Sequence, residues 1–233
     1  MYHPFSVAET LRSAWDILKK NFATIIVYSI VSLVAVFLSG FVIYHFLEDA
    51  WLAAGGVFLL LVIISYNFLA FIKLTFRLMD KEYYEFELAD VIPKFKSVGS
   101  YLVLLLIVST LTVFISNGIK NLEEGMTQNV LGIATGYFFQ FFFIFFFPLC
   151  TCFIVDDESG PFESVIQSVK LIRGNVIKYL ILFVIIEVLI SVGTFTIVGV
   201  LLVIPFVNIL LTVTYRKLVY SHLDVDDDIA ETN

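Results

Sequence analysis

The sequence predicts an all-α fold, a polytopic membrane helix bundle with six transmembrane helices. Hydrophobic residues make up 60% of the 233 residues, compared with roughly 45–50% in soluble domains, and the mean hydropathy is +0.96. Each of six apolar segments is long enough, at about 1.5 Å per helical residue, to cross a hydrocarbon core of about 30 Å. Because backbone groups in lipid must pair within their own segment and no alternating strand pattern competes, we expect helices.

The distribution of basic residues orients the six segments, which we place at residues 22–46, 52–76, 101–119, 130–155, 176–195 and 199–220. Of the 14 Lys and Arg residues, Lys120 alone falls on the opposite side of the implied membrane from the rest. Short loops that carry Lys and Arg remain in the cytoplasm during insertion. We therefore expect both termini and the two longer loops to be cytoplasmic.

Two connections, and more loosely a third, have helical amphipathicity and are expected to form interfacial helices in the headgroup plane. The first covers residues 6–20, where Ser6 and Glu9 make a capping-box pattern. Its apolar residues, which include Leu11, Trp15 and Leu18, recur at helical spacing. The second covers residues 161–174, and the third covers residues 86–96 with a proline inside it. Two or three interfacial helices are therefore predicted.

The first and last of these stretches match each other without a gap, with Glu9 opposite Glu163 and Asn21 opposite Asn175. This match suggests three parallel units, each an interfacial helix followed by a membrane hairpin, with a functional site where the units meet. The alternative is that amphipathic connectors resemble one another by composition. We place the units at residues 5–80, 83–157 and 161–221 of a single membrane domain, 1–221, followed by an acidic tail, 222–233, that we expect to be disordered.

Glu187 is the sharpest polar signal, because it lies near the centre of the fifth segment among apolar residues. A carboxylate at that depth costs about 2.5–3.5 kcal/mol on insertion scales and normally faces a bundle interior. Ser191 follows one turn later, and Asn208 and Thr212 repeat the spacing on the sixth segment. We expect Glu187 and Asn208 to come close inside the bundle. The role is either a proton-linked or lipid-headgroup site or a neutral acid that links two helices by a hydrogen bond.

Asn67 and Gln140 lie near mid-depth of the second and fourth segments and complete the candidate intramembrane polar cluster. Gln140 stands within residues 138–147, where eight of the ten residues are phenylalanine. So many rings cannot all face inward, and we expect lipid exposure or, alternatively, a greasy groove.

The chain shows no pattern typical of an enzyme site. It has no Gly-rich phosphate loop followed by a Lys and no His and carboxylate cluster suited to a metal. His3, His45 and His222 are scattered near the segment ends. We expect no catalytic residue, no metal, no cofactor and no nucleic-acid partner. The expected partners are membrane lipids and either another membrane protein or further copies of this chain.

The last third of the chain resembles a bacterial six-helix integral membrane family that includes YciC-like proteins and the membrane domain fused to some glycerophosphodiester phosphodiesterases. The residues that carry this resemblance are Gly160, Pro161, Phe162, Glu163, Ser164, Arg173, Gly174, Asn175, Gly199, Pro205 and Tyr215. The resemblance implies a bacterial cytoplasmic (inner) membrane location and an envelope or lipid-related role. The phosphodiesterase activity does not carry over, because that domain is missing from this sequence.

Two functions follow as hypotheses. The first is a non-enzymatic integral membrane protein that supports envelope lipids or a membrane complex through its interfacial helices. The second is a small transporter or permease-like protein with a central polar site around Glu187.

Overall fold

The computed structural model describes residues 5–46, 50–80, 88–122 and 125–231, and every regular element within these ranges is a helix. Six stretches are long and apolar enough to cross a membrane, and this confirms the predicted all-α membrane fold class. They are Phe22–His45, Trp51–Asp80, Ala89–Lys120, Met126–Asp156, Val176–Gly193 and Gly199–Ser221. The described residues form two compact units, one made of Met1–Lys94 and Lys170–Asn233 and the other of Phe95–Val169.

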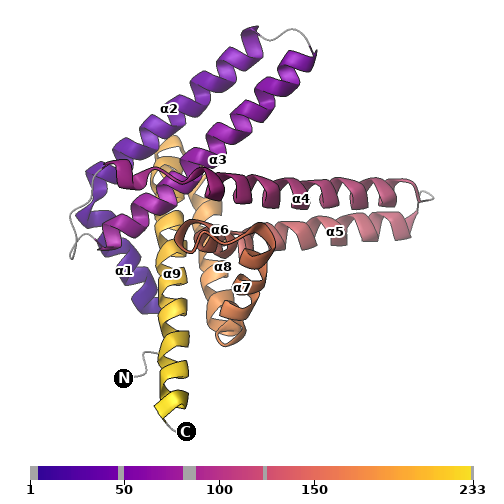
Figure 1. The fold of residues 1–233 in the computed structure, drawn as a ribbon. Coiled ribbons are helices and arrows are strands. Elements are labelled where there is room, and N and C mark those ends of the chain that lie inside the picture. Colours follow the sequence, from indigo (N-terminus) through magenta and orange to yellow (C-terminus); the bar gives the residue numbers. More distant parts are fainter. Residues whose placement is uncertain (1–4, 47–49, 81–87, 123–124, 232–233) are drawn as a thin grey trace. The chain divides into compact units, whose positions relative to one another are not determined.

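The first unit is organised around α9 (Ile197–Glu231), which contacts most of the other helices of that unit. The long hairpin of α2 (Phe22–Phe46) and α3 (Ala50–Asp80) packs against it, as do α1 (Val7–Lys20) and α8 (Val176–Gly193). Figure 1 shows α1 beside α9, while the α2–α3 hairpin diverges from α9 toward the loop that joins α2 to α3. The fully buried residues Ile209, Leu210 and Leu218 show that the core of this unit lies along α9.

The α1 helix buries part of its apolar side against protein, whereas the Trp15 side chain is 48% exposed. Ala14 and Leu18 are buried, α1 packs on α9 and α8, and Trp15 meets Phe206 edge to face with ring centroids 5.8 Å apart. The predicted capping box is wrong, because the Ser6 side chain makes no cap hydrogen bond. Instead the Thr10 hydroxyl donates to the Ser6 carbonyl oxygen at 2.6 Å.

The α9 helix is longer than the sequence predicts. It contains Pro205, which removes one backbone donor without ending the helix, as is tolerated where neighbouring helices pack around the break. It also continues to Glu231, through the acidic residues for which a disordered tail is expected.

The connection between α3 and α4 contains only a short 3-10 helix, η1 (Leu88–Val91), in its described part. Pro93 follows it, and α4 (Phe95–Lys120) begins two residues later. A proline has no amide to donate and disfavours the helical conformation of the residue before it. The looser interfacial helix predicted for residues 86–96 is therefore not formed in its described part, and residues 86–87 lie outside the described ranges.

In the second unit the predicted fourth segment is two helices, α5 (Met126–Phe145) and α6 (Phe147–Asp156), which pack with α4. Phe146 separates them, and Pro148 stands in the first turn of α6. A proline is favourable at the start of a helix and unfavourable inside one, and this explains the break. The phenylalanine run divides as predicted between exposed rings, such as Phe138, and buried rings, such as Phe145.

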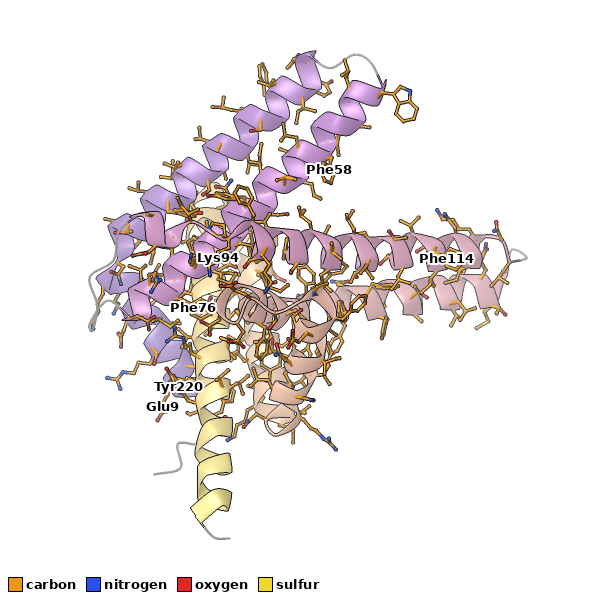
Figure 2. The ribbon with its side chains drawn as sticks, in the orientation of Figure 1. Glu9, Phe58, Phe76, Lys94, Phe114 and Tyr220 are labelled. Atoms are coloured by element: carbon orange, nitrogen blue, oxygen red, sulfur yellow. The ribbon has the colours of Figure 1, made fainter. Side chains whose placement is uncertain are left out.

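The helix α7 (Pro161–Arg173), predicted as the second interfacial helix, begins in the second unit. Ser164 and Ser168 are fully buried, whereas Phe162, Ile166 and Val169 are exposed. Of the apolar residues predicted for one side of this stretch, these three are exposed, whereas Ile172 is buried. Large apolar side chains also cover the outer surfaces of the membrane hairpins, for example Phe58 on α3 and Phe114 on α4 (Figure 2).

Candidate functional site

A cavity of about 620 Å³, the wedge cavity, lies between α2, α3 and α9 in the first unit. Its position follows from the packing of α3, whose residues 69–72 are buried whereas Ile64, one to two turns earlier, is exposed. Its lining is Tyr28, Ser29, Ser32, Leu33, Val36, Phe37, Ile64, Asn67, Phe68, Phe71, Val200, Leu201, Ile204, Pro205 and Asn208. The volume falls within the roughly 300–1,000 Å³ typical of small-molecule sites, and the mixture of many apolar and few polar groups is also typical of them.

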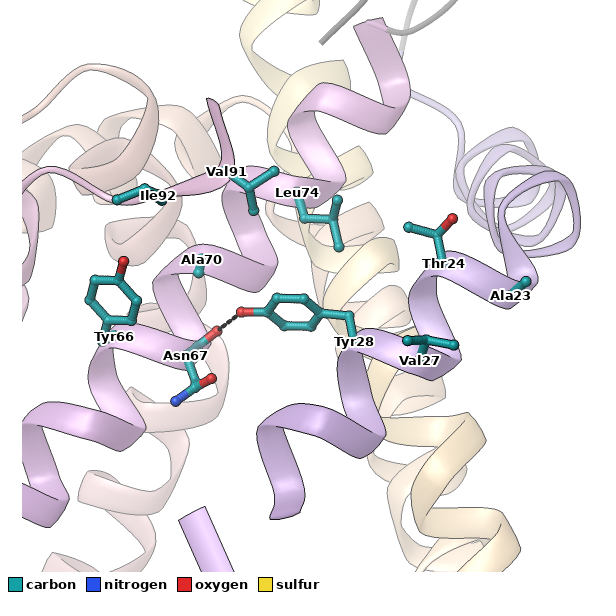
Figure 3. A pocket seen from close by; sticks show the side chains of 10 residues that line it. All are labelled: Ala23, Thr24, Val27, Tyr28, Tyr66, Asn67, Ala70, Leu74, Val91 and Ile92. Atoms are coloured by element: carbon teal, nitrogen blue, oxygen red, sulfur yellow. Dashed lines mark hydrogen bonds between the residues drawn. The ribbon is translucent and has the colours of Figure 1, made fainter. Parts of the chain in front are cut away.

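Tyr28 bridges the two helices of the α2–α3 hairpin. Its hydroxyl donates to the backbone carbonyl oxygen of Asn67 at 2.9 Å, and its ring packs against Phe71 with centroids 5.6 Å apart. A second cavity of about 620 Å³, the side cavity, is lined by Tyr28 and Asn67 as well, together with Ala70, Val91 and other residues of α2, α3 and η1. Figure 3 shows the Tyr28 ring reaching across this space to Asn67. The two cavities therefore share one polar bridge.

Asn67 and Asn208 place two amide groups on the lining of the wedge cavity. The Nδ2 of Asn67 donates to the Ile63 carbonyl oxygen at 2.8 Å, and the Nδ2 of Asn208 donates to the Ile204 carbonyl oxygen at 2.9 Å. Within the described part of the chain, neither side-chain carbonyl oxygen receives a hydrogen bond from another residue. Both oxygens can therefore accept a hydrogen bond from a ligand or from water.

The helices α3 and α9 are joined by an ion pair near the ends of their membrane stretches that are predicted to be cytoplasmic. The Arg216 guanidinium donates two hydrogen bonds to the Asp80 carboxylate, at 2.9 and 3.1 Å, and lies over the Phe76 ring at 5.0 Å from its centroid. Phe76 also meets Tyr215 with ring centroids 5.7 Å apart. A bidentate Arg–carboxylate pair is stronger and more directional than a single ionic contact, so this junction holds α3 to α9.

Glu187 lies on α8 and is half-buried, and its Oε1 atom is buried with no hydrogen-bond partner among the described residues. The two side chains that we expected to meet, Glu187 and Asn208, share no hydrogen bond in the part of the chain that the structure describes. Their proximity stays a prediction.

The remaining members of the predicted polar cluster lie in different surroundings. Thr212 is fully buried, and its hydroxyl donates to the Asn208 backbone carbonyl oxygen at 2.8 Å, one turn from the wedge cavity. Ser191 on α8 is exposed, and Gln140 on α5 is exposed and belongs to the other unit. The structure thus brings Asn67 and Asn208 to one cavity and places Thr212 next to it.

Sequence reasoning missed Tyr28 and the Asp80–Arg216 pair. A hydroxyl within the apolar α2 helix was the available signal for Tyr28. The ion pair joins residues 136 positions apart in the sequence, and the local pattern around either residue does not indicate its partner. Among the described residues, no three His, Cys, Asp or Glu side chains gather closely enough to hold a metal ion.

A scan against models of known families finds no match for this chain, and searches of curated proteins and of solved structures find none either. The resemblance of the last third to a bacterial six-helix family therefore stays a prediction.

Proposed function

We propose that this chain is a non-enzymatic integral membrane protein of the bacterial cytoplasmic membrane that binds lipid and so supports the envelope or a membrane complex. The observation that carries the proposal is the wedge cavity, which is apolar, is lined by helices able to cross a membrane and contains two open amide acceptors. Such a cavity suits a molecule with a long apolar part and a small hydrogen-bond donor.

The rim of the wedge cavity supports entry from the bilayer. Phe37 on α2 is 68% exposed, Leu33 on the same helix is 54% exposed, and Ile64 and Ile204 on the facing helices are also exposed. All four belong to membrane-competent stretches, so their surroundings are lipid. A lipid tail can reach the cavity sideways, without crossing a headgroup layer.

The amphipathic helix α7 supports a role at the inner leaflet. Its exposed stripe of Phe162, Ile166 and Val169 lies on the same short helix as Lys170 and Arg173. Apolar insertion combined with basic side chains is the composition of helices that lie in the interface of an anionic membrane.

The proposal is tested by filling the cavity. The full-length protein is extracted gently from its native membrane, and the lipids that remain bound are recorded by native mass spectrometry. We expect Val36→Trp to displace them, because Val36 lines the wedge cavity. Val34→Trp is the matched control, since Val34 is exposed on the same helix and is not on the cavity lining. Equal lipid retention in wild type, Val36→Trp and Val34→Trp would contradict lipid binding in the wedge cavity.

A second candidate function, transport, is favoured by one observation. Glu187 places a carboxyl oxygen without a described partner inside a membrane-competent helix, where ionisable residues commonly mark substrate or proton pathways. A transporter predicts that Glu187→Gln abolishes a substrate flux in proteoliposomes while the protein still folds. A lipid-binding support protein predicts that the same variant retains its lipids.

A further inference from the structure

A third cavity, the inner cavity, has a volume of about 760 Å³ and lies between α1, α3 and α9. Its lining includes Lys20 at the end of α1, Met79 near the end of α3, and Tyr220 near the end of the last membrane stretch. The last turns of two membrane-competent stretches and the junction before a third therefore meet at this cavity. Phospholipid headgroups lie at this depth in a bilayer.

The lining of the inner cavity is apolar on one part and charged on another. Ile17, Leu78, Met79 and Val213 supply the apolar part. The charged part contains Lys20, Arg216 and Lys217, together with one carboxylate, Asp16. Such a site suits the region of a phospholipid where the acyl chains join the headgroup. The chains would contact the apolar part of the lining, and the headgroup would contact the charged part.

The charges around the cavity carry both signs. Arg216 is held by its bidentate pair with Asp80, so much of its charge is already compensated. Glu9 acts electrostatically on Lys217 from α1. A lining made only of cations would favour a net-anionic ligand, whereas this mixture favours a ligand that carries both charges.

We infer that the inner cavity binds the phosphodiester of an inner-leaflet phospholipid with a phosphoethanolamine headgroup. The phosphate oxygens accept hydrogen bonds from the ammonium groups of Lys217 and Lys20, and the ligand's own ammonium pairs with the carboxylate of Asp16. This inference deepens the proposed lipid-binding function and depends on it. It adds the headgroup class, which the wedge cavity alone does not specify.

The test compares three probes on the purified full-length protein in detergent. They are a short-chain phosphatidylethanolamine, the matching phosphatidylglycerol and inorganic phosphate, and the readout is the dissociation constant of each from native mass spectrometry or calorimetry. We expect the ethanolamine lipid to bind the tightest and free phosphate the weakest, since phosphate cannot use the apolar part of the lining.

Two variants assign the roles of the charged groups. Lys217→Gln should weaken both lipids by about tenfold, because one charge-assisted hydrogen bond to phosphate is lost. Asp16→Asn should remove the preference for ethanolamine over glycerol while leaving phosphatidylglycerol affinity equal or higher. Arg12→Gln is the matched control for the loss of one charge, since Arg12 is exposed on α1 and is not on the cavity lining.

The outcomes separate this inference from the proposed function. If phosphatidylglycerol binds as tightly as the ethanolamine lipid, or if Asp16→Asn leaves the preference unchanged, the headgroup assignment is wrong while lipid binding stands. If inorganic phosphate binds as tightly as either lipid, the cavity recognises a phosphate group alone, and the inference that its ligand is a phospholipid is wrong. If the wild-type protein binds neither lipid, the inference fails, whereas the proposed function fails only if wild type, Val36→Trp and Val34→Trp also retain native lipids equally.

Discussion

The two membrane hairpins of the first unit are held together in opposite ways. In the α8–α9 hairpin, Gly193 lies so near Val203 that a Cβ atom on the glycine would stand 2.5 Å from a Val203 methyl carbon. In the α2–α3 hairpin a large side chain, Tyr28, spans the gap and donates to the Asn67 carbonyl oxygen. Neither Gly193 nor Val203 lines any of the three cavities, the wedge, side and inner cavities, whereas Tyr28 lines two of them.

This difference shows how one fold can combine rigidity with space for a ligand. In lipid there is little hydrophobic drive between helices, so small residues that permit close backbone approach hold a pair together by dispersion. A hairpin bridged by one long polar side chain loses such contacts on both sides of the bridge. We infer that the close α8–α9 contact is the stable support and that α2 and α3, together with the facing side of α9, form the walls of the ligand site.

The largest effect is expected from a methyl group added at the tight hairpin. A Cβ atom on Gly199 would overlap the Gly193 carbonyl oxygen, which is backbone and cannot rotate away. Gly199→Ala should therefore lower the free energy of unfolding by about 1–3 kcal/mol or more, measured by thermal unfolding in detergent. Gly55→Ala on α3 is the control, because a Cβ atom there would meet nothing within 4 Å. An equal loss of stability in both variants would remove the contrast between the hairpins.

The next effect concerns the junction that joins the two hairpins. Asp80→Asn leaves the Arg216 guanidinium without its bidentate partner and should cost about 1.5–3 kcal/mol of unfolding free energy, the range for hydrogen bonds to charged groups. The swapped pair Asp80→Arg with Arg216→Asp should recover part of that loss. A swapped pair less stable than either single variant would show that the junction depends on the packing of Phe76 and not on the ion pair.

The sequence predicted the bounds of an element well where polar residues mark both of its ends. The predicted second element of the chain, residues 22–46, coincides with α2 because an apolar run lies between polar residues. The segment predicted at residues 130–155 is divided because Pro148 acts on the backbone, whereas hydropathy averages across it. For α1 the apolar spacing placed Leu18 on the buried side, but Trp15 of the same pattern is exposed. The spacing also did not indicate whether protein or lipid covers that side, because apolar residues are favourable against both.

The candidate site was less predictable, for a related reason. Asn67 and Asn208 stood out as amides within apolar runs, and both do line the wedge cavity. Tyr28 did not stand out, because a tyrosine has mostly apolar surface and is ordinary in such helices. Which residues of different helices meet depends on packing between distant parts of the chain, and no periodicity within a single helix contains that information.

A smaller effect is expected at the tyrosine bridge. Tyr28→Phe keeps the ring and removes the hydroxyl that donates to the Asn67 carbonyl oxygen, so it should cost about 0.5–1.5 kcal/mol of unfolding free energy. Because Tyr28 lines both cavities, the variant should change which lipids are retained. Tyr44→Phe is the control, since Tyr44 on the same helix is 82% exposed. Identical stability and identical lipids in the two variants would mean that the bridge has no part in ligand binding.

The smallest effect on stability is expected at Glu187, although a carboxylate near the centre of an apolar segment is the most unusual polar feature of the sequence. If its carboxyl linked two helices, replacing it would remove a hydrogen bond of about 1 kcal/mol. Its Oε1 atom, however, is buried with no partner among the described residues, so Glu187→Gln removes no described bond at that atom and replaces an ionisable group by a neutral amide. The free energy of unfolding should therefore stay the same or rise. A loss of about 1 kcal/mol or more would show that Glu187 is a structural link between helices, and unchanged stability with altered flux would favour transport.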